Sequence, residues 1–105
     1  MAIAGQTLTP VQARSLEKVR AIVLSHLGDR PARVWLFGSF ARGEAHRFSD
    51  IDVAIDGGAI LPPLLKANIE EALEESTVPY FVDIVDLAES PSLRDRVEAE
   101  GIQWR

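Results

Sequence analysis

The chain has 105 residues, a formal net charge of -5 and a hydrophobic fraction of 47%, which suits one small domain with its own core. The acidic balance argues against a general nucleic-acid-binding surface, and the lack of cysteine excludes disulfides and thiolate metal sites. No apolar run approaches the roughly 18 residues of a membrane span, and residues 1–7 lack the features of a signal peptide. We therefore expect a single domain over residues 1–105, located in the cytoplasm, without direct nucleic-acid or membrane contact.

The first predicted element is a helix that begins after Thr9. Thr9 can act as the N-cap, Pro10 fits the first helical position, and Gln12 completes a capping box. An apolar face follows at helical spacing and is made by Leu16, Val19, Ile22, Val23 and Leu27. Gly28 is then expected to end the helix.

Residues 34–37 form an uninterrupted apolar run, which predicts a central strand covered on both faces. A Gly-Ser pair at 38–39 interrupts the run, and residues 40–42 are expected to form a short helix. Residues 50–56 alternate strictly in polarity and predict a second strand. One face of this strand carries Asp50, Asp52, Ala54 and Asp56, and the other carries Ile51, Val53 and Ile55.

The second half of the chain predicts two helices separated by a strand. A helix is expected from a proline at 62 or 63 to about residue 75. Its inward positions are predicted to be Leu64, Leu65, Ile69, Ala72 and Leu73. Residues 80–87 read as a third strand, and residues 90–100 as a last helix that ends at Gly101. This order of elements predicts an α/β or α+β fold with a small sheet.

Two carboxylates on the second strand are the first candidate site. Asp50 and Asp52 would project from one strand face about 6 to 7 Å apart. Two metal ions about 3.5 to 4 Å apart would fit between and beside such carboxylates, and hard oxygen ligands suit Mg²⁺ or Mn²⁺. A solvated face of a half-exposed strand gives the same pattern. Ser49 is expected to brace this strand.

A third carboxylate in the next strand would favour the metal interpretation. Asp83 lies inside an apolar run, where a charged residue rarely stays unpaired. If the two strands are neighbours, Asp83 completes a cluster whose like charges call for a cation. Asp86 is the competing choice and ranks second, because it lies nearer the strand end, where solvent exposure is expected.

The Gly38-Ser39 pair is the candidate phosphate-binding element. Gly38 permits a tight turn and close approach of a ligand, and Ser39 adds a hydroxyl donor at the start of a short helix. Most such pairs simply make turns. Arg42 either contacts phosphate or holds the loop to a carboxylate, and both roles stay open. His46 and Arg47, in a polar loop, are either plain surface or substrate contacts.

Taken together, the motif Gly-Ser-Phe-Ala-Arg-Gly at 38–43, Ser-Asp-Ile-Asp at 49–52 and Asp83 resembles the minimal nucleotidyltransferases of the polymerase-beta-like superfamily, called MNT proteins. The resemblance runs from about Val11 to Trp104, and the combined motif is far more specific than its parts. It implies a small mixed sheet with helices packed on one side.

The resemblance also implies roles for the site residues. Gly38 and Ser39 match positions that bind the phosphates of a nucleotide, with ATP as the expected donor. Asp50 and Asp52 match the first two metal ligands, for two Mg²⁺ ions or Mn²⁺. Asp83 matches the third carboxylate, which binds metal and can activate an incoming hydroxyl.

A partner follows from the same resemblance. Minimal members are often paired with a separate all-helical HEPN protein in toxin–antitoxin systems, and some of these antitoxins transfer AMP to a tyrosine of the toxin. The leading hypothesis is therefore a Mg²⁺-dependent transferase that acts as an antitoxin. A non-catalytic antitoxin that neutralises a HEPN partner by contact, and an enzyme modifying a small hydroxylated molecule, are the alternatives. The last helix and residues 102–105 are the candidate docking segments.

Overall fold

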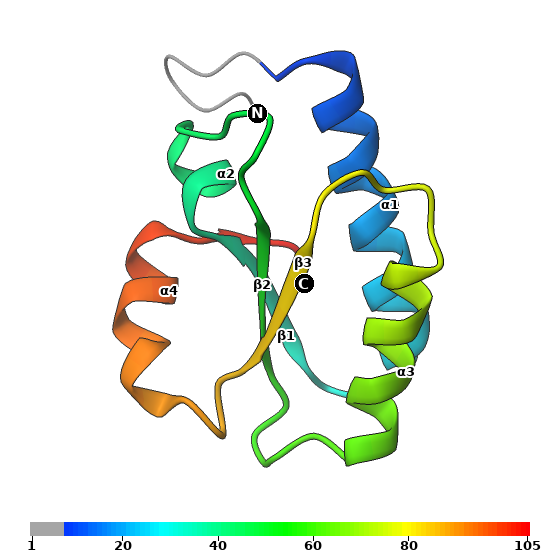
Figure 1. Cartoon of the computed structure of the whole chain (residues 1–105). Helices are drawn as coiled ribbons and strands as arrows, with labels where there is room; N and C mark the ends of the chain where they lie inside the picture. The colour runs from blue at the N-terminus through cyan, green and yellow to red at the C-terminus, as the bar shows by residue number, and fades with distance from the viewer. Residues whose placement is uncertain (1–7) are drawn as a thin grey trace.

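The computed structural model describes residues 8–105, and its architecture is a four-stranded mixed sheet with helices against it (Figure 1). The elements in chain order are α1 (Pro10–Leu27), β1 (Arg33–Phe37), α2 (Ser39–Arg42), β2 (Ile51–Asp56), α3 (Pro63–Glu74), β3 (Val82–Asp86), a 3₁₀ turn (Pro91–Leu93), α4 (Arg94–Glu100) and β4 (Ile102–Gln103). Residues 1–7, where the sequence argues against a signal peptide, lie outside the described residues. Within residues 8–105, no helix has the length and apolar character needed to cross a membrane.

The strands lie in the order β3-β2-β1-β4. β1 pairs antiparallel with both β2 and β4, whereas β2 and β3 are parallel. The register places Phe37 opposite Asp52 and Asp52 opposite Asp83. The predicted small mixed sheet is therefore confirmed, and β2, which carries Asp52 and directly follows Asp50, lies in its interior.

Both faces of the sheet are covered by apolar side chains. α1 and α3 pack against one face, where Val34 and Leu36 of β1 belong to the main core. Trp35 and Phe37 point to the other face and join a second cluster that includes Val97 of α4. Figure 1 shows α4 across the sheet from α1 and α3. The prediction that β1 is covered on both sides is confirmed. The expectation that the helices pack on one side of the sheet holds for α1 and α3, whereas α4 lies on the other side.

Local signals in the sequence account for the first helix. Thr9 Oγ1 accepts a hydrogen bond from Gln12 N at 3.1 Å, and Gln12 Oε1 accepts one from Thr9 N at 2.9 Å. The predicted capping box is therefore present, and such an N-cap typically stabilises a helix by about 1 kcal/mol. Val19, Val23 and Leu27 are buried along the predicted face.

One prediction about an inward-facing side chain is wrong. Leu64 was expected to face inward but is 72% exposed. The buried stripe of α3 runs through Ile69 and Leu73. Because a helix has 3.6 residues per turn, Leu64 points away from that stripe. Residues 102–103 of the tail, which was named as a candidate docking segment, form β4 on β1 and remain exposed. A two-residue strand leaves no periodic pattern that a sequence could reveal.

Candidate active site

Two of the three candidate carboxylates lie on one face of the sheet, and the third directly precedes β2. Asp52 of β2 stands opposite Asp83 of the parallel neighbour β3, so their side chains emerge on the same side. Asp50 directly precedes β2, and its charge acts on Asp52. The condition set by the sequence, that the two strands are neighbours, is met. Asp50 and Asp83 are exposed and Asp52 is half-buried.

The environment of Asp52 opposes its negative charge. Partial burial is the main cause that raises the pKa of Asp52 above its usual range, and the charges of Asp83 and Asp50 raise the pKa further. Arg96 and Arg42 act in the opposite direction. A half-buried carboxylate with two further carboxylates near it forms a site where a cation is favoured.

Asp86 has a different role from the one considered for it. It was ranked as the alternative third carboxylate and expected to be exposed, but it is only 2% exposed. Its carboxylate accepts hydrogen bonds from Leu61 N at 2.8 Å and from Ala88 N at 2.9 Å. Asp86 therefore anchors the connection between β2 and α3 to the end of β3. Being three residues after Asp83, it projects to the opposite face of the strand.

The Gly38 turn packs directly on the Asp52 carboxylate. Gly38 has a φ of +75°, a conformation that side-chain-bearing residues rarely adopt. A Cβ at this position would overlap Asp52 Oδ2. Ser39 follows, half-buried, as the first residue of the predicted short helix α2. The turn that is the candidate phosphate-binding element therefore adjoins the carboxylates.

Two arginines lie near the carboxylates. Arg42 contacts Glu44 Oε1 at 2.8 Å and Glu100 Oε2 at 3.5 Å, so of its two open roles the structure shows the carboxylate contact. Arg96 of α4 also contacts Glu100, at 3.3 Å, and its charge lowers the pKa of Asp52. Arg96 was not singled out from the sequence, because nothing in the sequence indicates that α4 packs on the face that carries Asp52.

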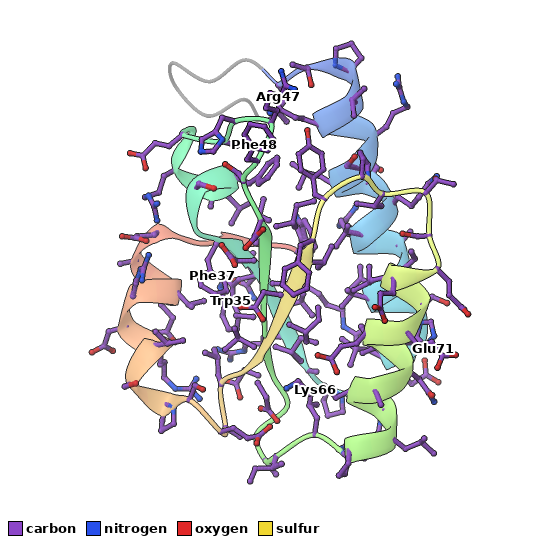
Figure 2. All side chains as sticks on the ribbon, in the orientation of Figure 1. Trp35, Phe37, Arg47, Phe48, Lys66 and Glu71 are labelled. Carbon is purple, nitrogen blue, oxygen red and sulfur yellow. The ribbon has the colours of Figure 1, made fainter. Side chains whose placement is uncertain are left out.

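The loop before β2 is held by its own polar contacts. Ser49 Oγ accepts a hydrogen bond from His46 N at 2.9 Å, and this contact holds the loop that leads into β2. Phe48 is 78% exposed, and the Arg47 guanidinium lies 5.0 Å from the centre of its ring. Figure 2 shows Arg47 and Phe48 together, near the start of β2 and away from Trp35 and Phe37 in the sheet. His46 and Arg47 are exposed residues of this loop.

The donor set fits a divalent metal that arrives with a nucleotide. Among residues 8–105, no group of three or more His, Asp or Glu side chains already has the spacing of a metal site. Mg²⁺, however, commonly takes one or two protein carboxylates and completes its coordination with water and substrate phosphates. Asp52 and Asp83, opposite each other in adjacent strands, offer such a pair of hard oxygen ligands.

Comparison with known proteins places the chain in a family. The family model described as polymerase beta, nucleotidyltransferase matches residues 17–103. An MntA protein of Haemophilus influenzae is 42% identical over 55 residues, which make up 52% of this chain and 48% of that protein. The protein adenylyltransferase MntA of Thermococcus cleftensis is 36% identical over 77 residues, 68% of this chain and 76% of that protein. The chain thus spans about half the length of the Haemophilus relative.

A solved structure shares the fold. A chain from a crystal structure of a toxin–antitoxin with AMP-PNP superposes with a TM-score of 0.69 at 30% identity, covering 85% of this chain and 72% of that chain. The sequence comparisons and the structural comparison therefore assign this chain to the same family. The chain belongs to the polymerase-beta nucleotidyltransferase family, in its minimal MNT group.

Proposed function

We propose that this protein is a Mg²⁺-dependent nucleotidyltransferase that moves AMP from ATP to a hydroxyl, and that the acceptor is a tyrosine of a HEPN toxin for which it acts as antitoxin. The observation that carries the proposal is that Asp52, Asp83 and the Gly38 turn meet at one end of the strands β1, β2 and β3. The relatives named adenylyltransferase and the toxin–antitoxin structure support the choice of AMP and of partner.

Each element of the site has a role in the proposed reaction. Gly38 and Ser39 hold the triphosphate through backbone N–H groups of the turn and the Ser39 hydroxyl. Asp50, Asp52 and Asp83 would hold two Mg²⁺ ions, or Mn²⁺ in place of Mg²⁺. When bound, the metal supplies neutralisation of the phosphate charge. Arg42 and Arg96 add positive charge beside the same carboxylates, in a chain whose net charge is -5.

The proposed transfer is an in-line substitution at the α-phosphorus. The acceptor oxygen forms a bond to phosphorus while the bond to the bridging oxygen of pyrophosphate breaks, and pyrophosphate leaves. Asp83, which is exposed on the edge strand β3, takes the proton of the acceptor hydroxyl. Positioning and charge neutralisation account for most of the rate in such transfers.

The test is transfer of label from ATP labelled at the α-phosphate, with Mg²⁺, to proteins of a lysate and to a purified HEPN partner. We expect a labelled band with the intact protein and none with Asp52→Asn. Asp29→Asn is the matched control, because Asp29 is exposed and precedes β1 at the end of the sheet away from Gly38. Equal labelling by Asp52→Asn would refute the assigned site.

Protection from the toxin separates catalysis from contact. A cell expressing the toxin is given either the intact protein or the double variant Asp50→Asn/Asp52→Asn. Lost protection by a folded double variant supports the catalytic antitoxin. Full protection would show instead that the protein neutralises its partner by binding.

A further inference from the structure

An open groove lies between α3 and the chain leading into β3. It encloses about 410 Å³ and is lined from α3 by Glu70 and Glu74, and from the other side by Tyr80, Phe81 and Asp83. α3 and β3 lie side by side in Figure 1, with β3 at the edge of the sheet. Asp83 lies in the edge strand β3 and lines the groove, while its side chain belongs to the carboxylate cluster on the face of the sheet opposite α3. The groove and the cluster therefore adjoin each other at the edge of the sheet.

The charge of the groove disfavours a nucleotide. Glu70, Glu74 and Asp83 are its charged lining residues, and no Lys, Arg or His lines it. In the part of the chain that the structure describes, none of these three carboxylates takes part in an ion pair. A triphosphate would be repelled here, whereas Arg42 and Arg96 attract it on the other side of Asp52.

The groove also presents apolar surface that the fold leaves uncovered. Phe81 is 68% exposed, although it directly precedes β3 and its carbonyl pairs with Ile51 N. Tyr80 beside it is held by an edge-to-face contact with Phe40, so the backbone around Phe81 is fixed while its ring faces solvent. An exposed aromatic ring beside unpaired carboxylates is typical of a surface that binds a protein segment with apolar and basic side chains.

We propose that this groove binds the acceptor segment of the partner protein, a stretch in which basic residues flank the accepting tyrosine. The inference rests on the proposed function, since the groove is assigned the acceptor because Asp83, one of its lining residues, also belongs to the carboxylate cluster. Glu70 and Glu74 contact the flanking basic side chains, and Phe81 packs against an apolar part of the segment. The accepting hydroxyl then lies at Asp83, and the nucleotide lies on the side of Arg42 and Arg96.

Binding of two synthetic peptides tests the groove without requiring transfer. One peptide carries a tyrosine flanked on both sides by arginine, and the other carries the same tyrosine flanked by glutamate; both bear a fluorophore for anisotropy. We expect the basic peptide to bind at least about tenfold more tightly. The double variant Glu70→Gln/Glu74→Gln should lose most of that preference, and Phe81→Ala should weaken basic-peptide binding by about tenfold.

A matched variant on the same helix distinguishes peptide binding in the groove from attraction of the peptide to the protein's net charge. Glu71→Gln/Glu75→Gln removes the same two charges from exposed positions of α3 and its C-cap that do not line the groove. We expect this control to bind the basic peptide nearly as well as the intact protein. Equal losses in both double variants, or no binding of either peptide at millimolar concentration, would overturn the proposal. Peptide binding that follows these expectations while no protein is ever labelled would refute the proposed transfer and leave the groove standing.

Discussion

Two aspartates on the same face of β2 have opposite electrostatic surroundings. Asp52 lies near two other carboxylates and is half-buried, and its pKa is raised. Asp56, four residues later, accepts a hydrogen bond from Arg94 Nη1 at 2.6 Å, and this contact is the main cause that lowers its pKa. One end of the strand face therefore carries a satisfied carboxylate, and the other end carries a carboxylate that the fold destabilises.

The difference indicates which carboxylate serves the fold and which serves a ligand. A paired aspartate is stabilised by its partner in the folded state, as Asp56 is by Arg94. An aspartate that lies beside other carboxylates is stabilised when a bound cation balances their negative charges. Asp52 has two arginines within its field, but neither forms an ion pair with it among the described residues. The site is thus prepared for a ligand that brings positive charge.

The largest expected effect, on AMP transfer and on melting temperature, comes from neutralising Asp52 and Asp56 one at a time. Asp52→Asn should reduce AMP transfer by about a thousandfold, because several kcal/mol of charge stabilisation are lost with the metal ligand. The same change should leave the melting temperature unchanged or higher, because it removes like-charge repulsion. Asp56→Asn should give the reverse pattern, a lower melting temperature with transfer retained. Thermal melts and initial rates on both variants measure this, and a destabilised Asp52→Asn would break the contrast.

The next effect comes from the turn that packs on Asp52. Gly38→Ala places a Cβ against Asp52 Oδ2 at a φ of +75°, and we expect transfer to fall about a hundredfold. Gly58→Ala is the control, because Gly58 has a φ of +79° but nothing within 4 Å of an added Cβ. Both variants should lose about 1 kcal/mol or more of unfolding free energy in denaturant titrations. Equal loss of transfer in both would show that strain, and not the contact with Asp52, is responsible.

The sequence predicted that Asp52 and Asp56 share a face of one strand, but not what surrounds each of them. Alternation from 50 to 56 placed Asp52 and Asp56 on one face, and the specific motif singled out Asp52. The partners of each aspartate are set by tertiary packing: Arg94 and Arg96 come from α4, some 40 residues away in the chain. The same reason explains Asp86, whose burial depends on the loop at Leu61 folding over it. Periodicity shows which face a residue occupies and does not reveal what lies opposite that face.

A smaller effect is expected from the cation near Asp52. Arg96→Gln removes a charge that lowers the pKa of Asp52 and that we assign to the nucleotide side of the site. The KM for ATP should rise about fivefold with a smaller change in kcat, as expected for lost ground-state binding. Arg20→Gln, on the exposed face of α1, controls for net charge. An unchanged KM in Arg96→Gln would place the triphosphate away from α4.

The smallest effect is the pH dependence of the Asp56 pair. Because the pKa of Asp56 is lower in the folded state than the usual value near 4, its contribution to stability is complete above that value and disappears as the pH falls through the folded pKa. Arg94→Gln should therefore lower the melting temperature by a few degrees at pH 7, since pairs near the surface contribute little. The difference from the intact protein should shrink in melts below about pH 4. A difference that persists unchanged in acid would mean that Arg94 stabilises the fold by packing, and the contrast between Asp56 and Asp52 would then not rest on charge.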